Sequence, residues 1–231
     1  MTTLISIPHA AAQLGVHLLP AQLEQLTRYL ALVQKWNKVY NLTALRDPAS
    51  MLTHHLFDSL AAIPPLQRQL TEQAAAQSSA QPSRLLDVGS GAGLPGVVMA
   101  ICCPALSVTC VDTVGKKAAF VQQVALELRL PNLRGLHARV ESLTDPYDVV
   151  SARAFASLRD FSTWSRAALA PHGVWLAMKG KHPQDEIAAL PADVAVFHVE
   201  QLQVPELDAE RCIVWMCATT HPRWASLSQS P

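Results

Sequence analysis

The chain has 231 residues, of which 50% are apolar and 16% are charged, and its mean hydropathy is +0.17. This composition is typical of a globular protein with one large domain, or with a main domain and an extension. Eighteen basic residues balance eighteen acidic ones, so the net charge does not indicate a nucleic-acid-binding protein, although a local basic face is compatible with neutrality.

Targeting and redox features predict a cytoplasmic protein. The N-terminus has no basic stretch followed by a long apolar core, and no run reaches about 18 apolar residues, so we expect neither export nor membrane insertion. The cysteines form no C-x-x-C pair, and we expect reduced thiols rather than metal ligands at Cys102, Cys103, Cys110, Cys212 and Cys217.

The N-terminal part of the chain is predicted to be helical. Apolar residues from Leu23 to Trp36 recur at spacings of three and four, which predicts a helix over residues 20–40. A second helix is expected to begin at Asp47, as N-cap, and to end before Pro64, because Pro48 fits the first helical position.

A change of composition and period divides the chain into four parts. Residues 1–70 are the predicted helical extension, and residues 71–83, which lack large apolar side chains, are expected to be a solvated, partly helical connection. Residues 84–220 carry the alternating pattern of the main domain, and residues 221–231 are left as a tail.

The main domain is predicted to be an α/β fold with a seven-stranded, mostly parallel sheet. Short β-rich runs alternate with helix-like stretches, a pattern that gives parallel strands with crossover helices. The last two runs are separated by only six residues, PELDAE, so they should pair antiparallel. The predicted strands are 84–88, 106–111, 133–138, 147–152, 174–179, 194–204 and 211–220, and the predicted helices are 95–101, 115–129, 157–169 and 183–189.

The segment LLDVGSGAGLPGVVMA, residues 85–100, is the clearest candidate for a ligand-binding loop. It follows the first strand of the sheet, where open α/β folds bind ligands. A phosphate-binding P-loop is excluded because no Gly-Lys-Ser/Thr follows, and a dinucleotide loop would need glycine at Leu94. The candidate ligand-binding residues here are Asp87, Gly89, Ser90, Gly91, Gly93 and Leu94.

Two carboxylates bear on the choice of ligand. Asp87 lies inside the first strand, where an acid disfavours a pyrophosphate and suits the α-amino group of S-adenosylmethionine. Asp112 ends the second strand and could accept the ribose hydroxyls of either NAD or S-adenosylmethionine, so it does not discriminate between them. Together these features favour S-adenosylmethionine.

Five blocks in the chain are similar, in order, to the RsmG (GidB) family. They are NLTALRDPASMLTHHLFDSL, LLDVGSGAGLPGVVMAI, VDTVGKKAAFV, DVVSARAFASL and MKG. The resemblance implies a class I methyltransferase fold (Rossmann-like) and methylation of N7 of a guanosine in the 530 loop of 16S rRNA. It further implies S-adenosylmethionine contacts at Gly89, Leu94, Val140, Glu141 and Arg153, to which the class I pattern adds Asp87 and Asp112.

The absence of certain residue types limits which methylation reactions the chain could catalyse. No cysteine lies between Cys110 and Cys212, which excludes a cysteine nucleophile after the fourth strand, as C5 methylation of pyrimidines needs. N7 of guanine carries a lone pair and no proton, so no general base is expected. Arg153 is the candidate catalytic residue, acting by orientation and charge; the alternative is a surface ion pair with Asp148 or Asp160.

Five further residues are candidates for RNA contact at the same end of the sheet. Phe155 could stack on a flipped guanine, although an aromatic residue before a helix can equally belong to the core. The lysines could bind phosphate, or be ordinary solvated side chains. The set is Lys116, Lys117, Phe155, Lys179 and Lys181.

The HHLFDS block could suggest a metal site, but no metal is expected. Asn41, His55 and Asp58 are predicted instead to hydrogen-bond the helical extension to the top of the sheet and close the cofactor site. The expected partner is 16S rRNA or the small ribosomal subunit, with the protein as a monomer. A small-molecule methyltransferase, a NAD-dependent oxidoreductase and a non-enzymatic S-adenosylmethionine sensor stay open as alternatives.

Overall fold

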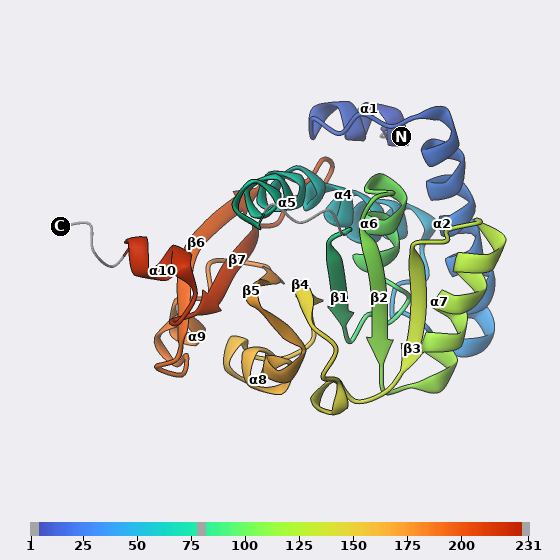
Figure 1. Ribbon diagram of the computed structural model, residues 1–231. Coiled ribbons are helices and arrows are strands. Elements are labelled where there is room, and N and C mark those ends of the chain that lie inside the picture. Colours follow the sequence, from blue (N-terminus) through green and yellow to red (C-terminus); the bar gives the residue numbers. More distant parts are fainter. Residues whose placement is uncertain (1–4, 78–81, 228–231) are drawn as a thin grey trace.

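The computed structural model describes residues 5–77 and 82–227. Its centre is a seven-stranded sheet of order β3-β2-β1-β4-β5-β7-β6, with helices packed on both faces (Figure 1). The strands are β1 (Arg84–Val88), β2 (Ser107–Asp112), β3 (Leu133–His137), β4 (Tyr147–Arg153), β5 (Leu169–Lys179), β6 (Val194–Leu202) and β7 (Arg211–Ala218).

The predicted topology is confirmed. The four pairings among strands β1 to β5 are all parallel. Strand β7 runs antiparallel to both of its neighbours, β5 and β6. The chain reverses between β6 and β7 because the intervening segment is too short for a crossover helix. As a result, β7 begins at the edge of the sheet where β1, β4 and β5 end, which brings Arg211 to the ligand-binding edge.

The crossover helices are α6 (Gly96–Cys102), α7 (Gly115–Glu127), α8 (Leu158–Trp164) and α9 (Gln184–Ala188). The helix expected over residues 157–169 is shorter than predicted. It ends at Trp164, because the buried Ser165 hydroxyl donates to Phe161 O at 2.6 Å and accepts the indole N–H of Trp175 at 2.9 Å. A 3₁₀ turn, η3 (Arg166–Ala168), then leads directly into β5.

The N-terminal extension packs as part of the main core. Its elements are α1 (Ile7–Gln13), α2 (Pro20–Tyr40), α3 (Pro48–Met51), a π-helical turn η1 (Leu52–Phe57), α4 (Asp58–Ala61) and α5 (Ile63–Gln77). Helix α2 runs beside α6 and α7 (Figure 1), and its Gln22 and Gln25 side chains donate to Ile101 O and Leu128 O at 2.9 Å. One apolar cluster joins Leu26 of α2 to Leu85 of β1.

Residues 71–77 of the expected connection form the end of helix α5, and residues 71–76 are exposed apart from Gln73, as expected of a partly helical, solvated segment. Gln73 is buried, and its amide nitrogen donates to Asp148 O and His172 O at 3.1 and 3.2 Å. The sequence did not predict this burial, because one buried glutamine in a polar stretch leaves no apolar period. Residues 78–81 of the expected connection lie outside the described residues.

The predicted C-terminal tail is replaced by structure. Helix α10 (Pro222–Leu227) lies against β6, and Arg223 donates to Gln69 at 2.7 Å while its guanidinium stacks over Phe197 at 4.5 Å. Residues 228–231 of that tail are outside the described part. Within residues 5–77 and 82–227, no helix has both the length and the apolar character needed to cross a membrane.

Candidate functional site

Two adjoining pockets lie at the carboxyl ends of the parallel strands. The inner pocket, of ≈ 530 Å³, is walled by the glycine loop, by η1 and α4, and by residues that end β4 and β5 or begin β7. The outer pocket, of ≈ 360 Å³, is walled by segments that follow β2, β3 and β4. Gly89 and Ala154 line both, so the two pockets meet at the end of β1.

The glycine loop holds a conformation that its first glycine requires. Gly89 has φ +64°, and a Cβ there would lie 2.2 Å from Cδ2 of Phe155, so a larger residue would be strained and would collide. The loop is anchored from the sheet, since Gly89 N and Ser90 N donate to Val111 O at 2.9 and 3.3 Å. It is also anchored from the extension, since the buried Tyr29 hydroxyl donates to Ala92 O at 2.8 Å.

Asp87 lies in the core beneath this loop and hydrogen-bonds the residues around it. Its carboxylate accepts Gly96 N at 3.0 Å and the Ser151 hydroxyl at 2.8 Å, and it is fully buried. Burial raises the pKa of Asp87 to about 6, against the lowering effect of those two hydrogen bonds. Asp87 lines neither pocket, so its role in this conformation is to fix the start of α6, and contact with a ligand's amino group stays a prediction.

The outer pocket is lined by the residues at the end of β2 and after β3 that were predicted to bind the cofactor. The Asp112 carboxylate accepts Val114 N at 2.8 Å and Gly91 N at 3.0 Å, and Lys117 Nζ lies 3.9 Å away. Val140 and Glu141 form a 3₁₀ turn, η2 (Val140–Ser142), on the same wall. Glu141 is exposed, and its own backbone N–H and then the bond from Arg139, at 2.7 Å, lower the pKa of its carboxyl.

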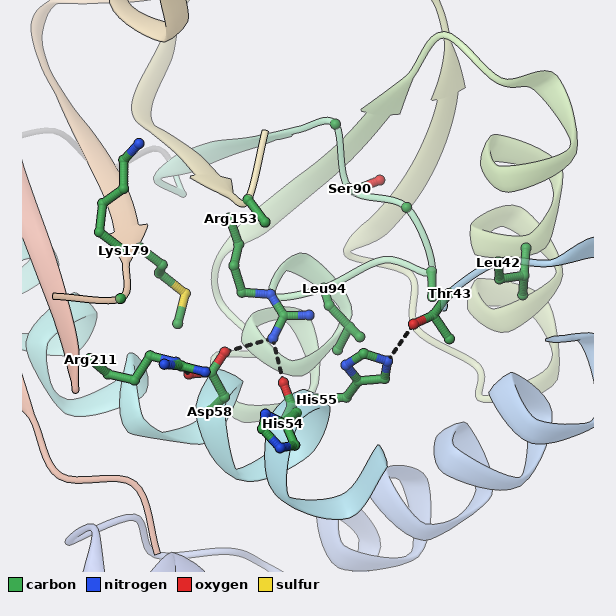
Figure 2. Close-up of a pocket in the computed structure, with 16 residues that line it drawn as sticks. Leu42, Thr43, His54, His55, Asp58, Ser90, Leu94, Arg153, Lys179 and Arg211 are labelled. Atoms are coloured by element: carbon green, nitrogen blue, oxygen red, sulfur yellow. Dashed lines mark hydrogen bonds and ion pairs between the residues drawn. The ribbon is translucent and has the colours of Figure 1, made fainter. Parts of the chain in front are cut away.

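The inner pocket holds a buried cluster of two arginines on one carboxylate. Arg153, at the end of β4, donates from Nη1 to Asp58 Oδ2 at 2.7 Å and to His54 O at 2.8 Å. Arg211 Nε donates to Asp58 Oδ1 at 3.0 Å. Figure 2 shows both guanidiniums converging on Asp58, whose side chain is only 5% exposed. Two cations share one anion, so the cluster carries a surplus positive charge beside the pocket.

The expected alternative for Arg153, a surface pair with Asp148 or Asp160, is wrong. Asp148 accepts Arg84 N at 2.8 Å, and Asp160 bonds with Ser157. The prediction failed because it considered only acids near Arg153 in sequence, whereas the partner is 95 residues away.

The HHLFDS block lines the inner pocket, and the predicted bond from the extension to the sheet is confirmed for Asp58 but not for His55, which bonds a residue of the extension itself. His55 Nε2 lies 2.8 Å from the Thr43 hydroxyl, and Asp58 bonds arginines from β4 and β7. The expectation for Asn41 is wrong: it ends α2 in a left-handed conformation and accepts from Arg46 at 3.0 Å. Asn37 holds this segment instead, through bonds to Thr43 N and Leu45 O at 2.9 Å.

The RNA candidates occupy unlike positions. Lys116 and Lys181 are exposed. Lys179 lines the inner pocket but donates to Glu186 at 2.8 Å and to Ala156 O at 3.0 Å. Phe155 forms the wall between Gly89 and the outer pocket, with Phe161 and Trp164 edge-on to its ring. The last of the five, Lys117, is half-buried beside Asp112.

Sequence reasoning missed Arg211, Thr43 and Tyr29. A signal for Arg211 was available, because the first residue of an antiparallel strand next to β5 must lie at the ligand-binding edge. Thr43 and Tyr29 carried no comparable signal, since nothing in the sequence says which loop an extension will contact. Among the described residues, no group of three metal-ligating side chains is gathered.

Comparison with known proteins gives a consistent picture. Residues 22–214 match the family described as rRNA small subunit methyltransferase G. Proteins named ribosomal RNA small subunit methyltransferase G from Acidovorax sp. (strain JS42) and Paracidovorax citrulli are 67% and 68% identical to this chain, of which they cover 91% and 89%. The matches span 93% and 86% of those proteins. A SAM-dependent methyltransferase from Aquifex aeolicus has a TM-score of 0.51 at 15% identity, over 76% of this chain and 96% of its own, which shows a shared fold.

Proposed function

Since the chain belongs to the rRNA small subunit methyltransferase G family, we propose that it methylates N7 of a guanosine in the 530 loop of 16S rRNA, with S-adenosylmethionine as cofactor. The products are 7-methylguanosine and S-adenosylhomocysteine. One observation carries the proposal beyond family membership: the two pockets meet at Gly89, so one elongated ligand can extend from Asp112 to Arg153. Rossmann-like sheets bind ligands at this edge.

The residues present fit an elongated cofactor with a planar end and a charged end. The outer pocket offers Asp112 and Glu141, whose carboxylates suit ribose hydroxyls and an adenine amino group. The inner pocket offers loop residues Ser90, Gly91 and Leu94 beside the guanidinium of Arg153. When bound, the cofactor supplies an electrophilic methyl group on a sulfonium.

The protein's own contribution is orientation and charge. The guanine nitrogen needs no deprotonation, and holding two reactants in line can account for about 7–11 kcal/mol of a barrier. Arg153 is held in place by Asp58 and His54 O, so its guanidinium is preorganised to contact cofactor and guanine O6. The extension forms one wall of the inner pocket with η1 and α4.

The RNA contacts are proposed to be unequal. Lys116 and Lys181 are exposed and suited to phosphate. Lys117 and Lys179 are already near carboxylates and serve the pocket walls, and Phe155 packs behind Gly89 rather than projecting toward a base. The small ribosomal subunit is the proposed partner, because a chain of zero net charge gains from a preformed RNA shape.

One experiment tests the function. The protein is incubated with labelled S-adenosylmethionine and, in separate reactions, undermodified small ribosomal subunits, free rRNA and tRNA. Label is expected in 16S rRNA, at a 530-loop guanosine that becomes cleavable by the borohydride and aniline treatment that detects 7-methylguanosine. Label on another rRNA base would retain rRNA methylation and remove the N7 assignment. No label in any RNA would overturn the function.

A further inference from the structure

His55 is placed at the inner pocket by an unusual turn. The segment Leu52–Phe57 is a π-helix, a form that occurs mostly as single turns and often at functional sites. The turn presents His54 O to Arg153 and the His55 ring to the pocket wall, between Thr43 and Arg153 (Figure 2). His55 is more than nine-tenths buried, with 8% exposure.

The hydrogen bonds around Thr43 assign the proton on the His55 ring. Thr43 Oγ1 accepts Leu45 N at 3.2 Å and lies 2.8 Å from His55 Nε2. We assign the threonine hydroxyl as the donor, since His55 Nε2 is the one acceptor recorded for it within residues 5–77 and 82–227. The ring proton is then on Nδ1. That atom is buried and has no hydrogen-bond partner among the described residues.

An unpaired buried N–H is uncommon in a folded protein and needs an explanation. The groups facing the ring are Arg153, Asp58 and His54. Burial and then the nearby Arg153 charge lower the pKa of His55 to about 4, against smaller raising effects of the His54 backbone and Asp58. The ring is therefore neutral at pH 7. A neutral N–H beside a guanidinium suits an oxygen acceptor and not a cation.

We infer that His55 is a ligand-contacting residue, whose Nδ1–H donates a hydrogen bond to an oxygen of the reacting pair. The inference rests on the proposed function and deepens it. Two oxygens have the required chemistry: the methionyl carboxylate of S-adenosylmethionine and O6 of the target guanine. His55 and Arg153 would then both donate hydrogen bonds to one ligand oxygen, from two directions. Thr43 is a positioning residue that keeps the proton on Nδ1.

The test compares His55→Asn with His55→Gln and His55→Ala. An asparagine amide can place an N–H near the position of Nδ1, whereas a glutamine amide reaches the position of Nε2. Affinity for S-adenosylmethionine, S-adenosylhomocysteine and decarboxylated S-adenosylmethionine is measured by calorimetry without RNA. Single-turnover methylation of undermodified subunits is measured at saturating cofactor. His17→Ala, an exposed histidine outside both pockets, is the matched control.

The expected result is at least a tenfold loss for His55→Ala and His55→Gln, with substantial recovery in His55→Asn. If the oxygen is the carboxylate, the loss appears in the affinity for both carboxylated ligands and is absent for the decarboxylated one. If the oxygen is guanine O6, cofactor affinity is unchanged and the single-turnover rate falls.

His55→Ala with wild-type affinity for all three ligands and a wild-type rate would overturn the inference. Recovery by glutamine and not by asparagine would also overturn it, since that pattern places the contact on Nε2. The binding measurements need no RNA, so they test the carboxylate contact of His55 even if rRNA methylation fails its own test.

Discussion

The inner and outer pockets meet at one glycine but are built in opposite ways. The inner pocket depends on charges buried in a shared cluster: the side chains of Asp58 and Arg153 are 5% and 17% exposed. The outer pocket has one buried carboxylate, Asp112, at 6% side-chain exposure, but its ion pair of Arg139 and Glu141 lies on the rim, with side chains 75% and 35% exposed. Buried charges interact strongly and depend on one another, whereas exposed pairs are weak and separable. Substitutions should therefore act cooperatively in the inner pocket and singly in the outer one.

Arg153→Ala is the largest expected break in the inner pocket. Removing a preorganised charge beside the reacting atoms should lower turnover by on the order of 100-fold or more. Leaving Asp58 with one partner should also destabilise the fold, by about 3 kcal/mol at most, because Arg211 stays bound to it. Methyl transfer and thermal unfolding are the two measurements.

Arg139→Ala is the outer-pocket counterpart of that change, and it should affect turnover only a few-fold. Arg153→Lys keeps the charge and removes the planar guanidinium, whose Nη1 alone bonds both Asp58 and His54 O. Equal turnover losses in Arg153→Ala and Arg139→Ala would contradict the contrast between the pockets.

Gly89→Ala acts on both pockets at once. The added Cβ would meet the Phe155 ring at 2.2 Å in a backbone with φ +64°, so we expect cofactor affinity to fall by about 10- to 100-fold, with a loss of about 1–3 kcal/mol of stability. Gly15→Ala is the matched control, because Gly15 has φ +71° and nothing within 4 Å of its Cβ position. Calorimetric binding and denaturant unfolding of the two variants separate collision from strain. Identical affinities would argue against a ligand at the junction.

The pH dependence of stability adds a second contrast, between two buried groups whose effects oppose each other: Asp87 beneath the glycine loop and His55 at the inner pocket. Asp87 has its pKa raised from 3.8 to about 6, so the folded state takes up a proton first and stability rises as pH falls from 6 to 4. His55 has its pKa lowered from 6.5 to about 4, so the unfolded state takes up a proton first and stability falls over that range. Each effect is on the order of 3 kcal/mol at most.

The two effects should nearly cancel in the wild-type protein. Asp87→Asn should lose stability on acidification from pH 6.5 to 4, because the effect of His55 is then no longer opposed by Asp87. His55→Gln should gain stability over the same range. Urea unfolding at half-unit pH steps, without cofactor, measures both slopes. Parallel slopes in the two variants would show that other groups govern acid stability.

Glu141→Gln is expected to have the smallest effect. The carboxylate is exposed and its pair with Arg139 is screened by solvent, so the fold should not change measurably. Cofactor KM should rise by about 2- to 10-fold, as expected for the loss of one hydrogen bond to a bound ligand, with kcat unchanged. A fall in kcat without a change in KM would move Glu141 from cofactor binding to a later step.

Local patterns sufficed for the sheet and not for the site. Every strand was predicted, because the alternation of strands and helices depends on patterns among neighbouring residues. The hairpin was predicted because only six residues separate the last two predicted strands. Asp58 and Arg153 are 95 residues apart, and Asp58 and Arg211 are 153 apart, so no local pattern could pair them. The same limit applies to Gln73, whose burial depends on carbonyls of β4 and β5 that only the fold brings near.

The hydrogen bond from Tyr29 to Ala92 links ligand binding to a helix that lines neither pocket. Tyr29 belongs to α2, and its bond to Ala92 O fixes the glycine loop in its observed conformation without a ligand. A ligand whose free concentration is 100 times its Kd stabilises the binding-competent state by about 2.7 kcal/mol. Opening of α2 releases the loop, so occupied protein should exchange the amide hydrogens of α2 about 100-fold more slowly. The extension would thus report, by its exchange protection, whether the sheet edge is occupied.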